Sequence, residues 1–375
     1  MRFPFMRRRR AASAAERYAT ATQLQLTWWR FRRHRLAMIS LVVLVLAYGM
    51  AIMADFLTTT DPHDTNAATS YIAPQAIHWH DDDGSFRPYI YGLKGVRDLR
   101  TFKLNYTVDT SRKVYLQFLA HNYTWSVLGF RSDLHLVGLR NPQRGDGIYL
   151  LGTDQLGRDL WSRLMVATRV SLFIGLTGVS ISLFLGIVLG GISAIYGGWV
   201  DLIVQRLIEV VRSMPTIPLW LGLAAALPSS WSVTQIYFAI TIIISLLAWT
   251  DLARVVRGKF LSLKEEDFVL AAELAGASQA RIIFRHMLPS FASHIIAAVS
   301  LALPAMIISE TSLSFLGLGL RPPAISWGVL LQDAQNIQTL ALAPWLLSAA
   351  VPVIFVILAF NFLGDGLRDA ADPYG

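Results

Sequence analysis

The chain has 375 residues, of which 54% are hydrophobic and only 15% charged, whereas a soluble domain carries about 25% charged residues. This composition favours an integral membrane protein. The formal net charge is +8 and cysteine is absent, which excludes a disulfide framework and a thiolate metal site.

The N-terminal arm, residues 1–35, carries the excess positive charge, with ten arginines against Glu16. A basic arm directly before an apolar run keeps the N-terminus of a first membrane helix in the cytoplasm. We therefore predict that the arm is cytoplasmic and lies beside membrane lipid, and we do not expect a nucleic-acid partner.

The first apolar run is Leu36–Leu57, which is 22 residues long with Asp55 as its only charged residue. A transmembrane helix needs about 20 residues, and a secretory signal peptide has an apolar region of about 7 to 15. The run, residues 36–57, is therefore predicted to be an uncleaved first transmembrane helix.

Residues 58–160 form a polar, aromatic and proline-containing segment, which we predict to be a periplasmic insertion. The stretches Arg100–Thr110 and Lys113–Ala120 mix β-branched and aromatic residues with polar ones, which is typical of short strands. The sequence HWHDDD at His78–Asp83 offers histidines and aspartates that could ligate a divalent ion. A solvated, charge-dense turn is the favoured interpretation, and no metal site is predicted.

Five further apolar runs bring the number of predicted spans to six; they are Val170–Tyr196, Leu202–Leu227, Ile236–Val256, Phe291–Ser309 and Trp345–Leu363. Counting from a cytoplasmic N-terminus places residues 228–235 outside, and residues 257–290 and the C-terminus inside. The charges agree, because 228–235 has no Lys or Arg whereas 257–290 has five. The predicted fold class is an all-α integral membrane protein, with an N-terminal anchor and a five-helix core in residues 161–375.

Glycines and prolines within these spans indicate where helices approach each other or bend. Gly186 and Gly190 form a GxxxG pair, which permits close helix packing. Pro215 and Pro218 are predicted to break the third span and Pro304 the fifth. Two interpretations remain open for these prolines, a kink in a packed bundle and a hinge beside a pathway.

The third span also carries Arg206, Glu209 and Arg212 at spacings of three, on one helical face. We expect them to form ion pairs with each other and with a neighbouring helix. No Ser/His/Asp or paired-carboxylate arrangement stands out within the spans, so no catalytic residue is predicted.

The loop 257–290 holds nine charged residues and must therefore lie in water. Ser262 and Glu265 have the spacing of a capping box, which predicts a helix over Leu263–Ala275. Gly276 then stands where a helix-terminating glycine in the left-handed conformation belongs. Ser278 is predicted to cap a second helix that ends before Pro289.

The two predicted helices of this hairpin carry more apolar surface than a free solvated loop needs; the residues are Ala271, Ala272, Leu274 and Ala275 on the first, and Ile282, Ile283, Phe284 and Met287 on the second. One alternative is that they pack on the cytoplasmic ends of the chain's own spans. The other is that they dock into a groove of another protein. Periodicity alone leaves both alternatives open.

The stretch DFVLAAELAGASQARIIFRHMLP, residues 267–289, resembles the EAA-type cytoplasmic loop of bacterial ABC-importer permeases. The pattern of that loop is EAA, a glycine after three further residues, and a late H-x-L-P. It is matched by Ala271, Ala272, Gly276, His286, Leu288 and Pro289. Leu270 stands where the family has glutamate, so no role is assigned to a carboxylate there.

Four other stretches resemble the dipeptide/oligopeptide/nickel branch of these permeases; they are LGTDQLGRD at 151–159, PTIPL at 215–219, SFLGLGLRPPAISWG at 314–328 and GDGLRDAADP at 364–373. The resemblance covers residues 150–375 well and the N-terminal anchor in its layout. Judged from its residues alone, the first stretch, LGTDQLGRD, is not predicted to be a phosphate-binding loop despite its glycines. Its aspartates are instead predicted to favour the positive end of the helix that follows.

The resemblance implies the transmembrane subunit of an ATP-driven importer in the bacterial inner membrane. Its partners would be a second homologous permease in a heterodimer, two cytoplasmic ATPase subunits that use ATP and Mg²⁺, and a periplasmic substrate-binding protein. The coupling loop, 257–290, would contact the ATPases through Phe268, Leu270, Ala271, Ala272, Leu274, Gly276, Ala277, Ile283, His286 and Pro289. Pro215, Pro218 and Pro304 are the candidates for the pathway or its hinges.

Energy must come from a partner, because the one Gly-Lys pair, Gly258 and Lys259, lacks the first glycine of a phosphate-binding loop, with Ala253 in that place. The chain is therefore expected to be a transport subunit that binds no cofactor, and not an enzyme. Short peptides are the expected substrates, with oligosaccharides, opines or nickel as alternatives. A membrane receptor or sensor is the alternative from another class.

Overall fold

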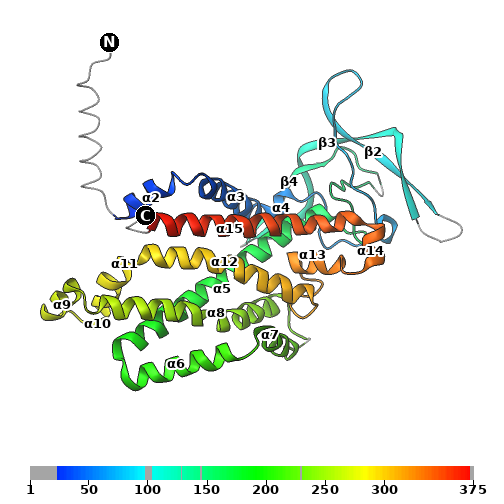
Figure 1. Cartoon of the computed structure of the whole chain (residues 1–375). Helices are drawn as coiled ribbons and strands as arrows, with labels where there is room; N and C mark the ends of the chain where they lie inside the picture. Colours follow the sequence, from blue (N-terminus) through cyan, green and yellow to red (C-terminus); the bar gives the residue numbers. More distant parts are fainter. Residues whose placement is uncertain (1–22, 98–103, 128, 144–145, 229, 372–375) are drawn as a thin grey trace, which may run out of the picture.

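A computed structural model describes residues 23–97, 104–127, 129–143, 146–228 and 230–371. The first 22 residues of the predicted basic arm, and part of the stretch Arg100–Thr110, lie outside these ranges. Long helices run side by side through most of the molecule, and a twisted sheet projects beyond one end of the bundle (Figure 1).

The long helices of the bundle are α3 (Arg35–Ile52), α5 (Leu160–Tyr196), α6 (Gly198–Ser213), α7 (Thr216–Ala225), α8 (Val233–Leu263), α12 (Ala292–Phe315) and α15 (Ala350–Ala371). Among the described residues, five helical segments are long and apolar enough to cross a membrane, and α6 with α7 makes a sixth if this pair, bent by 87°, counts as one span. The six predicted spans are therefore present, the third as a broken one.

Shorter elements connect these helices. On the N-terminal side they are α2 (Gln23–Phe31), α4 (Ala54–Leu57) and η1 (Ala67–Thr69). Between α8 and α12 they are α9 (Asp267–Leu274), α10 (Gln279–Arg281), the π-helix η2 (Ile282–Met287) and α11 (Leu288–Ser290). Between α12 and α15 they are α13 (Trp327–Asp333), α14 (Ile337–Leu342) and the 3-10 helix η3 (Pro344–Ala349).

The three prolines predicted to break spans behave differently. Pro215 lies at the bend itself, as the residue before α7. Pro218 lies in the first turn of α7, where a backbone N–H has no helical partner to lose, so it breaks nothing. Pro304 does not interrupt the fifth span, because α12 continues through it. Its role as a kink or a hinge stays a prediction. Contacts with α5 and α15 hold α12 as one helix despite the missing hydrogen bond.

The close helix approach predicted from the GxxxG pair is confirmed at the contact between α5 and α8. A Cβ added to Gly186 would lie 2.7 Å from the Leu252 Cβ, and one added to Gly190 would lie 2.5 Å from the Ala253 carbonyl oxygen. The absence of side chains at these two positions therefore sets the distance between the helices.

The described part of the insertion forms an antiparallel sheet in the order β1-β2-β3-β4, with β1 (His78–His80), β2 (Phe86–Arg97), β3 (Leu104–Val127) and β4 (Phe130–Leu139). The two stretches predicted as short strands both lie, where described, in the single long strand β3. The small core of the sheet contains Ile90, Val114, Leu116 and Ile148. The Thr58 hydroxyl, just after α4, lies 2.6 Å from the Tyr123 hydroxyl of β3 and so ties the sheet to the first span.

The HWHDDD stretch forms β1 and the turn after it. The Asp81 carboxylate accepts hydrogen bonds from the Lys113 ammonium at 2.6 Å and the Tyr115 hydroxyl at 2.7 Å. These bonds, the first above all, lower the pKa of Asp81 to about 2. Within the described ranges, no group of three or more His, Asp or Glu side chains could hold a metal ion.

Candidate functional site

The hairpin that follows α8 begins later than its sequence predicts. Ser262 lies inside α8, which continues from the membrane span to Leu263, and α9 begins only after Glu266. The predicted capping box was therefore wrong. The last turn of α8 is held by the buried Phe260, whose carbonyl accepts the Lys264 N–H at 2.9 Å. This tertiary anchoring outweighs a local capping preference.

The glycine stop of the hairpin is confirmed. Gly276 has a φ of +78°, in the left-handed region that favours glycine. Its N–H donates to the Glu273 carbonyl at 2.9 Å, and the Ala277 N–H donates to the Ala272 carbonyl at 3.0 Å. The second bond reaches back five residues, as in a Schellman motif, so the turn after α9 has a defined shape.

The second helix of the hairpin begins as predicted and ends differently. The Ser278 hydroxyl accepts the Arg281 N–H at 3.4 Å and caps α10. The helix then widens into η2 and passes through Pro289 in α11, so the predicted end before this proline was wrong. The Leu288 N–H bonds the Ile283 carbonyl five residues back, and Pro289 falls in a new first turn, where its missing N–H is tolerated.

The inner face of the hairpin packs on the chain's own spans. Val269, Ile282 and Met287 are buried in a cluster with Phe260 of α8 and Phe291 at the start of α12. The half-buried Ala272, Ala277 and Ile283 lie against the same cluster. The self-packing alternative is therefore correct for this face.

The outer face of the hairpin is exposed and apolar. Leu274 is 91% exposed, and Phe268, Leu270 and Phe284 are also exposed. Of the remaining predicted residues, Ala271, Gly276 and Pro289 are exposed and His286 is half-buried. The structure thus divides the predicted set into a supporting group and an outer face that is open to a partner.

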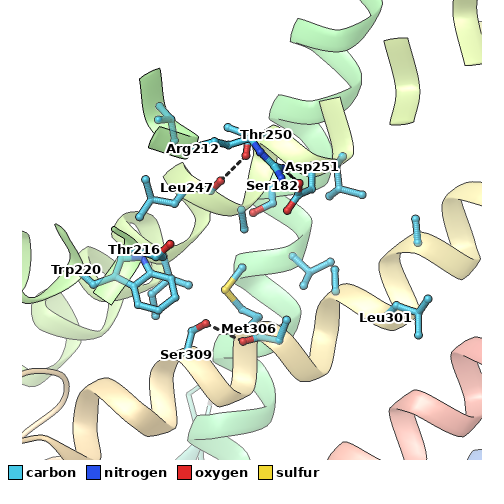
Figure 2. A pocket seen from close by; sticks show the side chains of 18 of the residues that line it. Ser182, Arg212, Thr216, Trp220, Leu247, Thr250, Asp251, Leu301, Met306 and Ser309 are labelled. Carbon is cyan, nitrogen blue, oxygen red and sulfur yellow. Dashed lines mark hydrogen bonds and ion pairs between the residues drawn. The ribbon is translucent and has the colours of Figure 1, made fainter. Parts of the chain in front are cut away.

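A cavity of about 530 Å³ lies between α5, the bend from α6 to α7, α8 and α12 (Figure 2). Thr216, next to Pro215, lines it on one side, and Ala305, next to Pro304, lines it on another. Pro215 and Pro304 are thus adjacent to lining residues, as is Pro218, which precedes the lining residue Leu219.

Charged side chains of α6 form the expected ion pairs. Arg206 Nη1 lies 2.6 Å from Glu209 Oε2 on the exposed side of the helix. Arg212 instead pairs with Asp251 of α8, and both residues line the cavity. Sequence reasoning did not name Asp251, although it is the only acidic residue of the predicted span Ile236–Val256.

A second hollow, of about 470 Å³, lies between the end of α7, the start of α8 and the segment Leu318–Ala324. This segment comes directly after α12, in the SFLGLGLRPPAISWG stretch. In the predicted orientation the second hollow is on the outer side and the first cavity is deeper in the bundle.

Glu310 of α12 is fully buried and, through two hydroxyls, fixes Leu320 within the segment that lines the second hollow and Trp327 just after it. Its carboxylate accepts hydrogen bonds from the Ser314 hydroxyl at 2.8 Å and the Ser171 hydroxyl at 3.3 Å. These hydroxyls in turn accept the Leu320 N–H at 3.0 Å and the Trp327 N–H at 3.1 Å. Sequence reasoning missed this acid, whose only signal was its place in an apolar run.

The LGTDQLGRD stretch supplies a buried ion network and a helix cap at the outer end of α5. Asp154 and Arg163, each 1% exposed, form an ion pair, and Arg163 also lies 3.2 Å from Asp333 at the end of α13. Asp159 caps α5 by accepting the Ser162 N–H at 2.8 Å, which confirms the predicted role of this aspartate. Burial raises the pKa of the Asp159 carboxyl to about 6.

Comparison with known proteins gives consistent matches. The family described as "Binding-protein-dependent transport system inner membrane component" matches residues 183–374, and "N-terminal TM domain of oligopeptide transport permease C" matches residues 22–74. All four described strands of the sheet lie between these two ranges.

Three similar relatives are transport proteins by name. The oligopeptide transport system permease protein OppC of Bacillus subtilis is 35% identical over 243 residues, which cover 64% of this chain and 76% of the relative. OppC of Haemophilus influenzae is 40% identical, covering 61% of this chain and 71% of the relative. The dipeptide transport system permease protein DppC of Lactococcus lactis is 41% identical, covering 60% and 64%.

Proposed function

The chain belongs to the family of binding-protein-dependent transport system inner membrane components, the permeases of ABC importers, and from this premise we propose that it carries short peptides across the inner membrane by alternating access. The peptide substrate is supported by the names of the relatives, which are oligopeptide and dipeptide permeases. As a multi-pass membrane permease the chain is a transport subunit and not an enzyme.

The energy for transport comes, in this proposal, from two cytoplasmic ATPase subunits that use ATP and Mg²⁺. A periplasmic binding protein delivers the peptide, and a second homologous permease completes the pathway as a heterodimer. The family description itself implies a binding protein.

The observation that carries the proposal is the division of the hairpin into two faces. The inner face is anchored to the ends of α8 and α12, so a displacement of the hairpin moves those spans. The outer face presents Leu274, Phe268 and Leu270 to water, which a soluble loop avoids unless a partner covers them. A rigid turn at Gly276 joins the two helices. This is the arrangement needed to transmit movement of an ATPase into the membrane.

The ends of the described chain support a cytoplasmic location for both termini. Phe31 at the end of α2 packs with Ala37 and with Ala370 near the end of α15. These two helix ends lie at the side of the bundle opposite the sheet (Figure 1). The sheet then lies in the periplasm, on the side from which the binding protein delivers its ligand.

The test is coupled transport by the reconstituted complex in proteoliposomes, comparing Gly276→Val with Gly258→Val. Valine at Gly276 is strained by the positive φ at roughly 1–2 kcal/mol, although its Cβ would meet open space among the described residues. Gly258 lies in α8 and its added Cβ also meets open space there, so it is a matched control without the strain. We expect Gly276→Val to lose peptide uptake while ATP hydrolysis continues, and Gly258→Val to behave as wild type.

Normal coupled uptake by Gly276→Val would overturn the coupling role of the hairpin. Uptake of oligosaccharides, opines or nickel in place of peptides would overturn the substrate assignment and leave the importer in place. Failure of any ATPase subunit to copurify would favour a membrane receptor or sensor.

A further inference from the structure

The cavity between α5, the α6–α7 bend, α8 and α12 has the size of a small-molecule site, which is typically about 300–1,000 Å³. Its walls are mainly apolar, with the hydroxyls of Ser182, Thr216, Thr250 and Ser309 between them. Among the described residues that line it, Arg212 and Asp251 are the ionisable ones. The cavity therefore offers one cationic and one anionic group and is otherwise neutral.

The two charges lie at one end of the cavity. Figure 2 shows Arg212 reaching to Asp251 beside Ser182, with Trp220 and Ser309 at the opposite end. In the predicted orientation the chain runs outward from Gly198 through α6, so it reaches Arg212 before Trp220 of α7. The pair is therefore at the cytoplasmic end of the cavity. A ligand that moves from this cavity towards the cytoplasm meets the pair first.

The pair is open to exchange with a ligand. The Arg212 and Asp251 side chains are 42% and 75% exposed in the chain, although both belong to the spanning segments. A charged side chain in the middle of a bilayer costs roughly 2.5–3.5 kcal/mol, so such residues face a bundle interior or a water-filled cavity. The buried pair of Asp154 and Arg163 contrasts with it, since each is 1% exposed and sealed from any ligand.

The position of Arg212 links the pair to the broken span. Arg212 lies in the last turn of α6, and the 87° bend to α7 begins directly after this helix. Asp251 belongs to α8, whose far end leads into the hairpin. Separation of the two side chains therefore changes a contact between two helices that border the cavity.

We propose that Arg212 and Asp251 form the inner gate of this cavity and recognise the ends of a zwitterionic peptide, Arg212 taking the carboxylate and Asp251 the ammonium group. The inference rests on the proposed peptide transport and names the residues that select for it. Opening the gate exchanges one ion pair for two, so neither charged side chain is left unpaired at membrane depth. An uncharged solute cannot make this exchange.

The test measures uptake by proteoliposomes of the full complex for one dipeptide in three forms, unmodified, N-acetylated and C-amidated. The variants are Asp251→Asn and Arg212→Gln, and Arg206→Gln is the matched control, since Arg206 pairs with Glu209 away from the cavity. Each variant is compared with wild type for the same peptide, so any preference of the binding protein cancels.

We expect Asp251→Asn to slow uptake of the unmodified peptide about tenfold or more and to leave the N-acetylated peptide within about twofold of wild type. Arg212→Gln should likewise slow uptake of the unmodified peptide and leave the C-amidated peptide within about twofold of wild type. Arg206→Gln should change nothing. Equal slowing of all three peptides or normal uptake by both variants would overturn the recognition of termini.

A second measurement does not depend on the rate of transport or on the binding protein. Because the chain has no cysteine, a Val255→Cys substitution introduces a thiol that is unique in it, at the cavity wall one helical turn from Asp251. The unmodified dipeptide should protect this thiol from a thiol-reactive reagent, and addition of Asp251→Asn should abolish the protection. Protection that survives Asp251→Asn would overturn the gate. A wild-type complex that imports no peptide would instead refute the proposed function itself.

Discussion

Truncation of Leu274 to alanine is the most direct test of whether the outer face of the hairpin binds an ATPase subunit. The side chain is 91% exposed, so its removal creates no cavity within this chain. If an ATPase groove buries it, Leu274→Ala removes three carbons from the contact. At roughly 0.8 kcal/mol per carbon the loss is about 2.4 kcal/mol, which weakens binding of one ATPase subunit about 50-fold.

The assay is titration of the purified ATPase onto the permease complex in nanodiscs, with Kd as the readout. Leu156→Ala is the matched control, because Leu156 is 49% exposed and lies in the insertion at the other end of the bundle. Its Kd should equal that of wild type. A Kd for Leu274→Ala within about threefold of wild type would refute docking through this residue, because three buried carbons would then contribute almost nothing.

Two further predictions concern the bundle itself. Gly190→Val places a Cβ 2.5 Å from the Ala253 carbonyl oxygen and should destabilise the complex by about 2 kcal/mol or more, seen as a lower thermal unfolding midpoint in detergent. Gly49→Val meets open space among the described residues and should not, so equal midpoints for the two variants would contradict the packing argument. Because Asp159 has a pKa of about 6 when folded and about 4 when unfolded, its contribution to stability is full below pH 4 and is lost as the pH rises through 6. The stability of the wild type should therefore fall by about 3 kcal/mol across this range, and Asp159→Asn should abolish this fall. Parallel pH profiles of stability for wild type and variant would rule the effect out.

Local rules predicted parts of the hairpin well. The roles of Gly276 and Ser278 depend only on a few neighbouring residues. Gly276 adopts a conformation that only glycine adopts easily, and the Ser278 hydroxyl caps a helix. The same kind of rule failed at Ser262 and at Pro289. In the first case the helix of the span simply continues, anchored by the buried Phe260, and in the second a π-turn absorbs the missing N–H.

Long-range contacts could not be predicted from single residues. Arg212 was expected to pair, but its partner on α8 follows from the packing of α6 and α8. The hydrogen bond between Ser171 and Glu310 joins residues 139 positions apart, and neither belongs to a recognisable motif. The apolar runs, in contrast, predicted the spans because length and hydropathy are properties of each segment alone.

The continuity of α8 from Val233 to Leu263 has a mechanical consequence. One unbroken helix carries Asp251 at membrane depth and ends at the hairpin, about 18 Å further along its axis at 1.5 Å per residue. It can therefore act as a lever arm that a movement of the hairpin tilts. A tilt of about 10° about its opposite end, about 27 Å from Asp251, would displace Asp251 by about 5 Å, which is enough to take a carboxylate out of hydrogen-bond reach of a guanidinium. No separate relay of side chains is needed between the hairpin and the ion pair, because the backbone of one helix joins them.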